Sequence, residues 1–255
     1  MLERIRLRLW AIDPSRLMAD GGLPPDPWQA NLLRQRHPET LILASRQAGK
    51  SQLASALALR EALLADPNCP ALVLILSPTL RQSGELFRQR LLPLWLGLGS
   101  PLKRRAATRL ELELANGSRI VSLPENEQGV RGFSGVSLLV VDEASRVDDN
   151  LYRAVRPMLA TSRGSIVALS TPFGRRGWFW ESWNSAEPWH RVPVPASACP
   201  RIPAEFLLRE RLRLGPRWYE QEFNLAFNDS IDQLFSADVI AQVMQGEAAP
   251  LFGGG

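Results

Sequence analysis

The sequence predicts an α/β fold in which a mainly parallel sheet lies between two layers of helices. Short apolar runs recur at residues 41–44, 71–77, 137–141 and 164–169, and such runs are typical of strands buried on both faces of a parallel sheet. Segments with a helical pattern alternate with them, as in βαβ units. The 255 residues, of which 45% are hydrophobic, suffice for one large domain of this class.

Residues 41–51, LILASRQAGKS, are the stretch around which we expect the other elements to be arranged. A short apolar strand leads into the loop SRQAGKS, and a helix is predicted from Gln52 to Ala65. Strand, loop ending in Gly-Lys-Ser and helix are the context of a phosphate-binding P-loop. Ala44 replaces the first glycine of that pattern, so the pattern alone could arise by chance. Only two of the 30 basic residues are lysines, however, and Lys50 is one of them.

In such a loop the backbone N–H groups and the helix N-terminus face the phosphates of a nucleotide. Gly49 lets the backbone approach the phosphates, Lys50 reaches the β- and γ-phosphates, and Ser51 ligates Mg²⁺. We therefore expect ATP to bind against the loop residues Ser45, Arg46, Gln47, Ala48, Gly49, Lys50 and Ser51.

The segment before the P-loop predicts two helices. Residues 2–10 alternate arginine with apolar residues, and a second helix is expected from Pro27 to about Arg36. Gln29 lies near its start, about twenty residues before the P-loop. Its side-chain amide either reads adenine, as in helicase-like ATPases, or is exposed at the helix start.

The middle of the chain predicts a further βα unit and a hairpin. The run at 71–77 predicts a buried strand, and a helix is expected from about Leu80 to Leu96. Residues 110–114 and 119–123 alternate in hydropathy on either side of an Asn-Gly pair. This arrangement is a strong signal for a β-hairpin.

The densest basic cluster, Lys103-Arg104-Arg105, lies just before this hairpin on a predicted loop. Clusters of this kind are most often solvated faces. The net charge of +4, almost wholly from arginine, fits phosphate partners without establishing them. The cluster is therefore either a solvated surface or a contact for nucleic acid.

The run SLLVVDE at 137–143 predicts another buried strand, which ends in the carboxylates of Asp142 and Glu143. After a P-loop this is the Walker B pattern, and we expect its strand to lie beside the P-loop strand. Asp142 is then placed to hold hydrated Mg²⁺, and Glu143 to orient and deprotonate the attacking water. The two patterns together predict a P-loop NTPase of the RecA-like (ASCE) type, with three layers in the order helix, sheet, helix.

The last third of the chain begins with a strand at 164–172, GSIVALSTP. It brings Ser170 and Thr171 to the sheet edge where open α/β sheets bind ligands. A helix at 178–183 follows, whose aromatic residues we expect to pack rather than to stack on bases. A strand and two helices at the end complete the prediction of an ATPase core (1–174), a helical lid over the nucleotide (175–235) and a tail (236–255).

Composition excludes several other classes of protein. Cys69 and Cys199 lie far apart without metal-binding or redox spacing, so we expect two free thiols in a reducing compartment. No apolar run of about 18 residues predicts a membrane span. The first ten residues lack the continuous apolar core of a signal peptide. We therefore expect a non-secreted protein with no membrane partner.

Taken together, the motifs resemble those of terminase large subunits, the ATPases that package DNA into the heads of tailed phages. SRQAGKS, with Arg46-Gln47 inside the loop, is similar to the deviant Walker A of that family. The other motifs follow in the family's order: Trp28-Gln29, SPT at 77–79, the Asn-Gly hairpin, VRG at 130–132, VVDEA at 140–144, STPFG at 170–174 and the closing WYEQEFNLAF at 218–227. The resemblance covers almost the whole chain.

The resemblance implies roles at the nucleotide. Lys50 and Ser51 bind phosphate and Mg²⁺, and Arg46 is placed for a phosphate clamp. Asp142 and Glu143 are the metal-binding and catalytic carboxylates. The family's coupling motif, which senses the γ-phosphate, corresponds to Ser170-Thr171.

The resemblance also implies partners and assembly. Arg131 corresponds to an arginine that acts on the ATP of a neighbouring subunit in a ring; the alternative is a structural arginine that binds loop carbonyls. The cluster Lys103, Arg104 and Arg105 falls where related motors grip double-stranded DNA. A portal protein and a small terminase subunit are implied as partners, in the cytoplasm of the host cell. Full-length members continue into a nuclease domain, whereas this sequence ends about 20 residues after the expected junction, so we expect no DNA-cutting activity from it.

We therefore predict an ATP-hydrolysing motor that moves double-stranded DNA into procapsids. A helicase-like ATPase is a rival function, but it needs a second RecA-like domain for which the length leaves no room. A nucleotide-independent DNA-binding remnant of a decayed prophage is the other rival. The presence of Lys50, Ser51, Asp142 and Glu143 argues against it.

Overall fold

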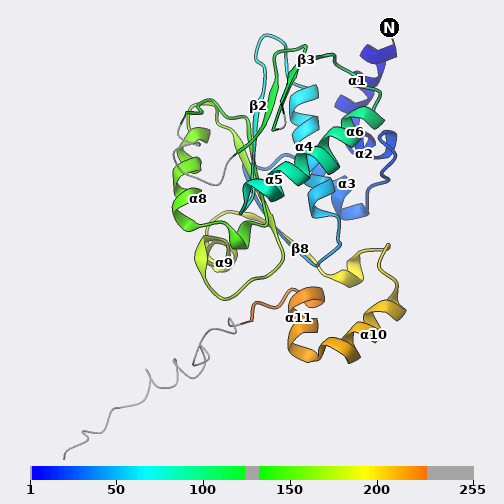
Figure 1. Ribbon diagram of the computed structural model, residues 1–255, viewed down its shortest axis with the longest axis vertical. Helices are drawn as coiled ribbons and strands as arrows, with labels where there is room; N and C mark the ends of the chain where they lie inside the picture. Colours follow the sequence, from blue (N-terminus) through cyan, green and yellow to red (C-terminus); the bar gives the residue numbers. More distant parts are fainter. Residues whose placement is uncertain (1, 109, 124–131, 229–255) are drawn as a thin grey trace, which may run out of the picture.

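An eight-stranded sheet forms the centre of the protein, in the strand order β3-β4-β5-β2-β6-β7-β1-β8 (Figure 1). The structure is a computed structural model that describes residues 2–108, 110–123 and 132–228. The strands are β1 (Glu39–Ala44), β2 (Leu72–Leu76), β3 (Arg104–Ala107), β4 (Glu111–Leu114), β5 (Arg119–Ser122), β6 (Leu138–Asp142), β7 (Ser165–Ser170) and β8 (His190–Val194).

The sheet is parallel from β5 to β8, and the β3-β4-β5 part is antiparallel. The expectation that the Walker B strand lies beside the P-loop strand is wrong, because β7 lies between β1 and β6. Leu43 of β1 is paired with Ser170 of β7, and Asp142 of β6 with Leu169. A continuous apolar run predicts burial but not which strand is its neighbour. The inserted strand is what carries Ser170 into the space between the two motifs.

Helices cover both faces of the sheet, which confirms the predicted three-layer α/β architecture. In Figure 1 the first six helices lie on one side of the sheet, and α8 and α9 lie on the other. The α-helices are α1 (Leu2–Ile12), α2 (Arg16–Asp20), α3 (Pro27–Arg34), α4 (Lys50–Leu63), α5 (Leu80–Leu86), α6 (Leu92–Gly97), α8 (Asp149–Val155), α9 (Gly177–Asn184), α10 (Ala204–Leu214) and α11 (Pro216–Asn224). Shorter turns are η1 (Phe87–Leu91), η2 (Ala144–Arg146), η3 (Arg156–Leu159) and η4 (Ala196–Ala198).

The core is divided by the sheet into two apolar clusters. Ile42 and Ala44 of β1 pack with α4 and the N-terminal helices, whereas Leu41 and Leu43 pack with the layer of α8 and α9. Successive residues of a strand point to opposite faces. Both faces of β1 are therefore buried, which is why the strand reads as an unbroken apolar run.

Three local features differ from the sequence prediction. The helix expected at 80–96 contains a π-helical segment, η1, between α5 and α6. The basic cluster does not lie wholly on a loop, because Arg104 and Arg105 begin the edge strand β3. The segment at 177–194, expected in the lid, supplies α9 to the core and β8 to the sheet, so the separate helical part begins after β8.

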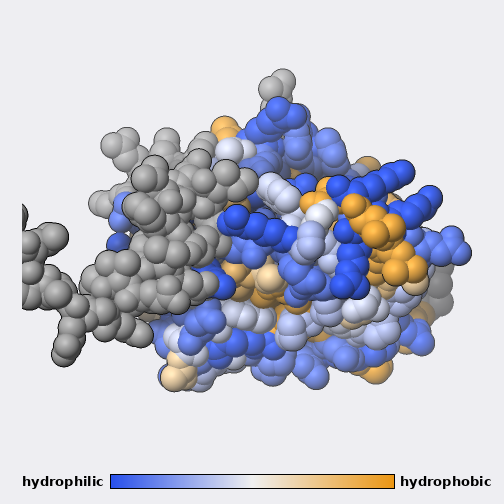
Figure 2. All heavy atoms as spheres, turned by 90° about the horizontal axis from the view of Figure 1, so that it is seen from below, coloured by the Kyte–Doolittle hydropathy of each residue, from blue (hydrophilic) through white to orange (hydrophobic). Residues whose placement is uncertain are grey.

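This helical part consists of η4, α10 and α11 and has a small core of its own around Tyr219 and Phe223. It lies below the sheet in Figure 1. Figure 2, seen from below, shows apolar side chains at the surface of the molecule among strongly hydrophilic ones. Leu208 and Leu212 of α10 are 64% and 88% exposed. No helix in the described ranges is long and apolar enough to cross a membrane.

Candidate active site

The P-loop occupies the turn between β1 and α4, and two of its residues have a left-handed backbone conformation. Gln47 has φ 59° and Gly49 has φ 91°. A side chain on Gly49 would also be obstructed, since its Cβ would lie 2.6 Å from Nε2 of Gln29 and 2.8 Å from Nη2 of Arg201. Glycine is therefore required at this position both by conformation and by space.

Lys50 is buried and points back into the loop. Its Nζ donates hydrogen bonds to the backbone oxygens of Ser45 at 3.0 Å and Ala44 at 3.4 Å. Burial lowers the pKa of Lys50, and the charges of Glu143 and Asp142 oppose that shift. The ammonium group is thus held by neutral carbonyl oxygens close to two carboxylates, in a position from which it can be recruited by an anion.

Gln29 supports the P-loop from behind. It is 1% exposed, which contradicts the alternative of an exposed residue at the helix start. Its Oε1 accepts the backbone N–H of Asp26 at 2.9 Å, and its Nε2 donates to the backbone oxygen of Gly49 at 3.1 Å. Both functions of the amide are therefore used within the chain; adenine reading by Gln29 stays a prediction.

The P-loop and Walker B residues meet at the start of α4. Ser51 Oγ donates to Oδ2 of Asp142 at 3.1 Å, while the buried Oδ1 of Asp142 has no hydrogen-bond partner among the described residues. Burial, and next the charge of Glu143, raise the pKa of Asp142 to about 6. An orphaned carboxylate oxygen beside a hydroxyl is a donor set of the hard oxygen type that Mg²⁺ prefers. The residues present therefore fit the predicted metal.

The turn after β6 is linked to the end of β7 by a serine pair. Ser145 Oγ and Ser170 Oγ lie 2.6 Å apart, and Ser145 Oγ also donates to the backbone oxygen of Thr171 at 2.9 Å. Glu143 occupies this turn with φ 50°, a left-handed conformation that is unusual outside glycine. Ser145, two residues after Glu143, thereby joins this turn to Ser170 and Thr171.

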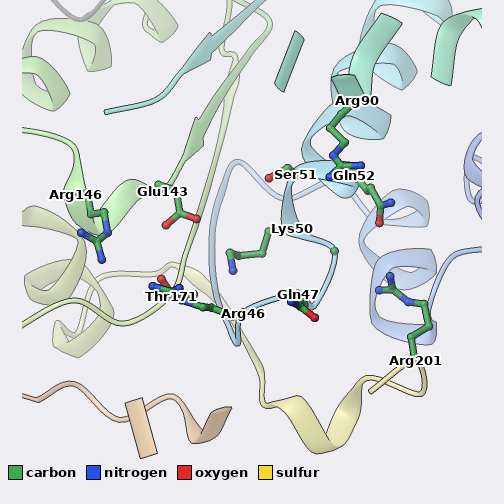
Figure 3. Close-up of a pocket in the computed structure, with 11 residues that line it drawn as sticks. Arg46, Gln47, Lys50, Ser51, Gln52, Arg90, Glu143, Arg146, Thr171 and Arg201 are labelled. Carbon is green, nitrogen blue, oxygen red and sulfur yellow. The ribbon is translucent and has the colours of Figure 1, made fainter. Parts of the chain in front are cut away.

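A cavity of about 780 Å³ opens over these groups (Figure 3). Five of the predicted P-loop residues line it, together with Glu143 and Thr171, while Ser45, Ala48 and Ser170 are buried away from it. The P-loop residues of the lining are Arg46, Gln47, Gly49, Lys50 and Ser51.

Sequence reasoning missed four residues of the cavity: Gln52, Arg90, Arg146 and Arg201. Arg90 comes from the π-helical segment, and Arg146 lies with its guanidinium carbon 3.9 Å from the ring centroid of Phe173. With Arg46 and Lys50, the three arginines surround the cavity with positive charge. Such a lining suits a polyphosphate. Only the DEASR segment after the Walker B strand could have indicated one of them, Arg146.

The helical part contacts the P-loop at two places. Glu222 of α11 is buried and forms an ion pair with Arg46, whose backbone N–H also donates to the backbone oxygen of Glu222 at 3.2 Å. Arg201 binds Asp26 through two nitrogens and donates to the backbone oxygen of Ala48 at 2.9 Å. The sequence predicted a helical lid over the nucleotide, but it did not predict these two contacts with the P-loop.

The remaining predicted residues lie elsewhere. Lys103 and Arg104 are exposed at the sheet edge, and Arg105 lies 3.6 Å from Glu113 in an ion pair. These residues line no part of the cavity. Arg131 and the tail at 236–255 fall outside the described residues. The cysteines at 69 and 199 are free thiols, as expected, and the aromatic residues of α9 pack, with Trp178 and Phe179 buried.

Comparison with known protein families decides the identity. Residues 41–236 match the family described as "Terminase large subunit, T4likevirus-type, N-terminal", which is more than half of the chain. The chain belongs to this family. It is the ATPase part of a terminase large subunit, the motor of viral DNA packaging.

Solved terminases share the fold. The large terminase ATPase domain of Thermus phage P74-26 is similar with a TM-score of 0.69 and 19% identity, over 82% of this chain and 96% of that one. The large terminase of a thermophilic bacteriophage, in complex with ADP, is similar with a TM-score of 0.63 and 12% identity, over 79% of this chain and 53% of that one. The HK97 bacteriophage large terminase is similar with a TM-score of 0.61 and 17% identity, over 79% of this chain and 50% of that one. This terminase thus spans about half the length of the last two. No curated protein sequence matches it.

Proposed function

We propose that this terminase binds ATP with Mg²⁺ in the cavity of Figure 3 and uses its hydrolysis to move double-stranded DNA into procapsids. The observation that carries the proposal is the convergence of Lys50, Ser51 and Glu143 on one cavity lined by arginines. Ser51 also binds the buried carboxylate of Asp142. These groups come from separate segments of the chain. Each is of the type that phosphoryl transfer requires: a phosphate-binding cation, oxygen ligands for a metal and a base for water.

Each side chain has a distinct task in this proposal. Lys50 leaves the carbonyl oxygens of Ala44 and Ser45 and neutralises phosphate charge. Arg46 exchanges its ion pair with Glu222 for a phosphate. Bound Mg²⁺, held by Ser51 and Asp142, would supply further charge neutralisation on the phosphates.

Water activation falls to Glu143. Its left-handed turn directs the carboxylate into the cavity, where it accepts a proton from the attacking water. Thr171 lines the same cavity, and its backbone is linked to the Glu143 turn through Ser145. Loss of the γ-phosphate can therefore alter the end of β7, which leads directly into the segment before α9.

The proposal extends to partners. Members of this family act with DNA and the capsid machinery; we propose double-stranded DNA, a portal protein and a small terminase subunit as partners of this chain, in the cytoplasm of the infected cell. A ring of subunits, with Arg131 acting on the neighbour's ATP, is part of the proposal. Support for the nucleotide comes from the large terminase of the thermophilic bacteriophage, which has been solved in complex with ADP and with ATP-gamma-S.

The experiment that tests this function compares ATP turnover alone, with double-stranded DNA and with single-stranded DNA of the same length. We expect Mg²⁺-dependent turnover that double-stranded DNA stimulates more strongly. Stimulation by single strands alone would favour the helicase-like alternative. Absence of turnover with DNA binding that ATP does not alter would favour the inactive remnant.

A further inference from the structure

Two neighbouring carbonyl groups of the P-loop are each bound by a side chain from elsewhere in the chain. Nη2 of Arg201 donates to the backbone oxygen of Ala48 at 2.9 Å, and Nε2 of Gln29 donates to that of Gly49 at 3.1 Å. Both oxygens thereby have a fixed direction. Hydrogen bonds to a charged donor such as Arg201 are the stronger kind.

The two held carbonyl groups also fix the direction of the neighbouring backbone N–H groups. In a trans peptide the C=O of one residue and the N–H of the next point in opposite directions. Holding the oxygen of Ala48 therefore orients the N–H of Gly49, and holding the oxygen of Gly49 orients the N–H of Lys50. These N–H groups stand at the N-terminus of α4, where a P-loop binds phosphate.

The two contacts share one buried residue, Asp26, which binds Arg201 through its carboxylate and Gln29 through its backbone. Asp26 is 6% exposed and accepts from Nη2 of Arg201 at 2.7 Å and from its Nε at 3.2 Å. The backbone N–H of the same Asp26 donates to Oε1 of Gln29 at 2.9 Å. Arg201, Asp26 and Gln29 thus form a single clamp behind the loop. Gly49 leaves the room for it, because a Cβ there would meet both side chains.

Arg201 lies on the connection between η4 and α10, 175 residues from Asp26. Figure 3 shows it on the opposite side of the cavity from Glu143 and Arg146. We infer that Arg201 is a positioning residue for nucleotide binding: it holds the P-loop amides ready for phosphate and makes this readiness depend on the connection to α10 and α11. The inference rests on the proposed binding of ATP in this cavity. It concerns ground-state affinity rather than the chemical step.

Removal of the clamp has a defined consequence. In the Arg201→Ala variant the Ala48 carbonyl loses its charged donor, so the loop must order when ATP binds. We expect the Kd for ATP to rise about tenfold, since the free energy of a charge-assisted hydrogen bond corresponds to a change in Kd of about that size. Turnover at saturating ATP should fall by a smaller factor than the affinity does, because Arg201 lies on the opposite side of the cavity from Glu143 (Figure 3). Arg201→Lys retains one donor and should show an intermediate Kd.

The experiment measures equilibrium binding of a fluorescent ATP analogue to the full chain without DNA, together with steady-state turnover. Arg209→Ala, on the exposed surface of α10, is the matched control and should bind as the unaltered protein does. Hydrogen exchange of the peptide 45–52 distinguishes a local effect from general destabilisation, which would also speed exchange elsewhere in the protein. We expect faster exchange there in Arg201→Ala, with unchanged exchange in the sheet.

The outcomes separate the inference from the function beneath it. If the unaltered protein fails to bind nucleotide, or if Lys50→Ala binds nucleotide as tightly as the unaltered protein, the proposed function and the role of Arg201 are both overturned. If binding requires Lys50 but Arg201→Ala binds ATP as tightly as the Arg209→Ala control, only the positioning role of Arg201 is overturned. Should Arg201→Ala fail to fold, Asp26→Asn decides, because it weakens the hold on Arg201 and should raise the Kd in the same direction.

Discussion

The hydroxyl of Ser51 donates a hydrogen bond to Oδ2 of Asp142 at 3.1 Å across 91 residues of sequence. This contact joins the P-loop to the Walker B strand over the end of β7, which lies between them in the sheet. The second oxygen of Asp142 is buried without a partner among the described residues. The carboxyl group is therefore unfavourably placed for ionisation until a cation arrives, and its pKa is raised to about 6.

This raised pKa predicts a pH-dependent stability of the metal-free protein. The folded state holds the proton of Asp142 more tightly than the unfolded state, in which the pKa of this carboxyl group is 3.8. The stability that it contributes is present below pH 3.8 and is lost as the pH rises through about 6. Asp142→Asn should therefore raise the free energy of unfolding at pH 8, by at most about 3 kcal/mol, and have less effect at pH 5.

Denaturant unfolding with a chelator at both pH values measures this difference. Asp66→Asn, at an exposed position, serves as the control. An equal effect of Asp142→Asn at pH 5 and pH 8 would contradict the account of this carboxyl group.

A second prediction concerns the ion pair of Arg46 with Glu222. In the absence of nucleotide, Glu222 competes with phosphate for this arginine. Glu222→Gln keeps the shape of the side chain but removes its charge, so ATP should bind roughly three- to tenfold more tightly. Isothermal titration with ATP under non-hydrolysing conditions measures the change. The control is Glu220→Gln on the same helix, whose carboxylate binds Asn224. Equal affinity of both variants would show that Glu222 does not compete.

Of the two residues in this ion pair, Arg46 was predicted from the sequence as part of the P-loop, and Glu222 was not. Lys50, Ser51, Asp142 and Glu143 were predicted because each motif is local, following a strand that is recognisable by its apolar run. Glu222 was not predicted, because its approach to Arg46 depends on how α11 packs below the sheet. Arg201 has the same explanation, since its partner Asp26 lies 175 residues away.

Strand order and local helix type were also beyond the sequence. An apolar run predicts a buried strand equally well at every interior position of a parallel sheet, so the place of β7 between β1 and β6 could not be foreseen. The π-helical segment that carries Arg90 lies within an amphipathic pattern that reads as continuous helix. The hairpin of β4 and β5 was predicted, because its Asn-Gly turn is a local signal.

A third prediction concerns the basic cluster at the sheet edge. If Lys103, Arg104 and Arg105 contact DNA phosphates, the log of the affinity for double-stranded DNA should fall with the log of salt by about 0.9 per contact. Arg104→Ala should reduce that slope by roughly one unit for all sequences alike. Arg105→Ala should reduce it less, because Arg105 is shared with Glu113. An unchanged slope in both variants, as in the Arg209→Ala control, would leave the cluster a solvated surface.

A fourth prediction tests whether Arg131 acts on a neighbouring subunit. Arg131→Ala and Glu143→Gln should each be inactive alone. Mixed under assembling conditions, they should recover part of the ATPase activity, because an Arg131→Ala subunit retains Glu143 and can receive Arg131 from its neighbour. Arginines supplied in this way are worth about 10³–10⁵ in rate in other NTPases. No recovery over a range of ratios, in rings shown to be mixed, would place Arg131 in its own site or outside catalysis.

The division of labour between Lys50 and Glu143 is the central claim. Lys50 acts on phosphate charge in the ground state, whereas Glu143 acts only on the attacking water. The most direct measurement is ATP binding and turnover of Lys50→Ala and Glu143→Gln side by side, with the exposed Glu181→Gln as control. We predict that Lys50→Ala loses binding, and that Glu143→Gln binds ATP normally but turns it over about 10²–10⁴-fold more slowly. Hydrolysis by Glu143→Gln at the unaltered rate would contradict the account.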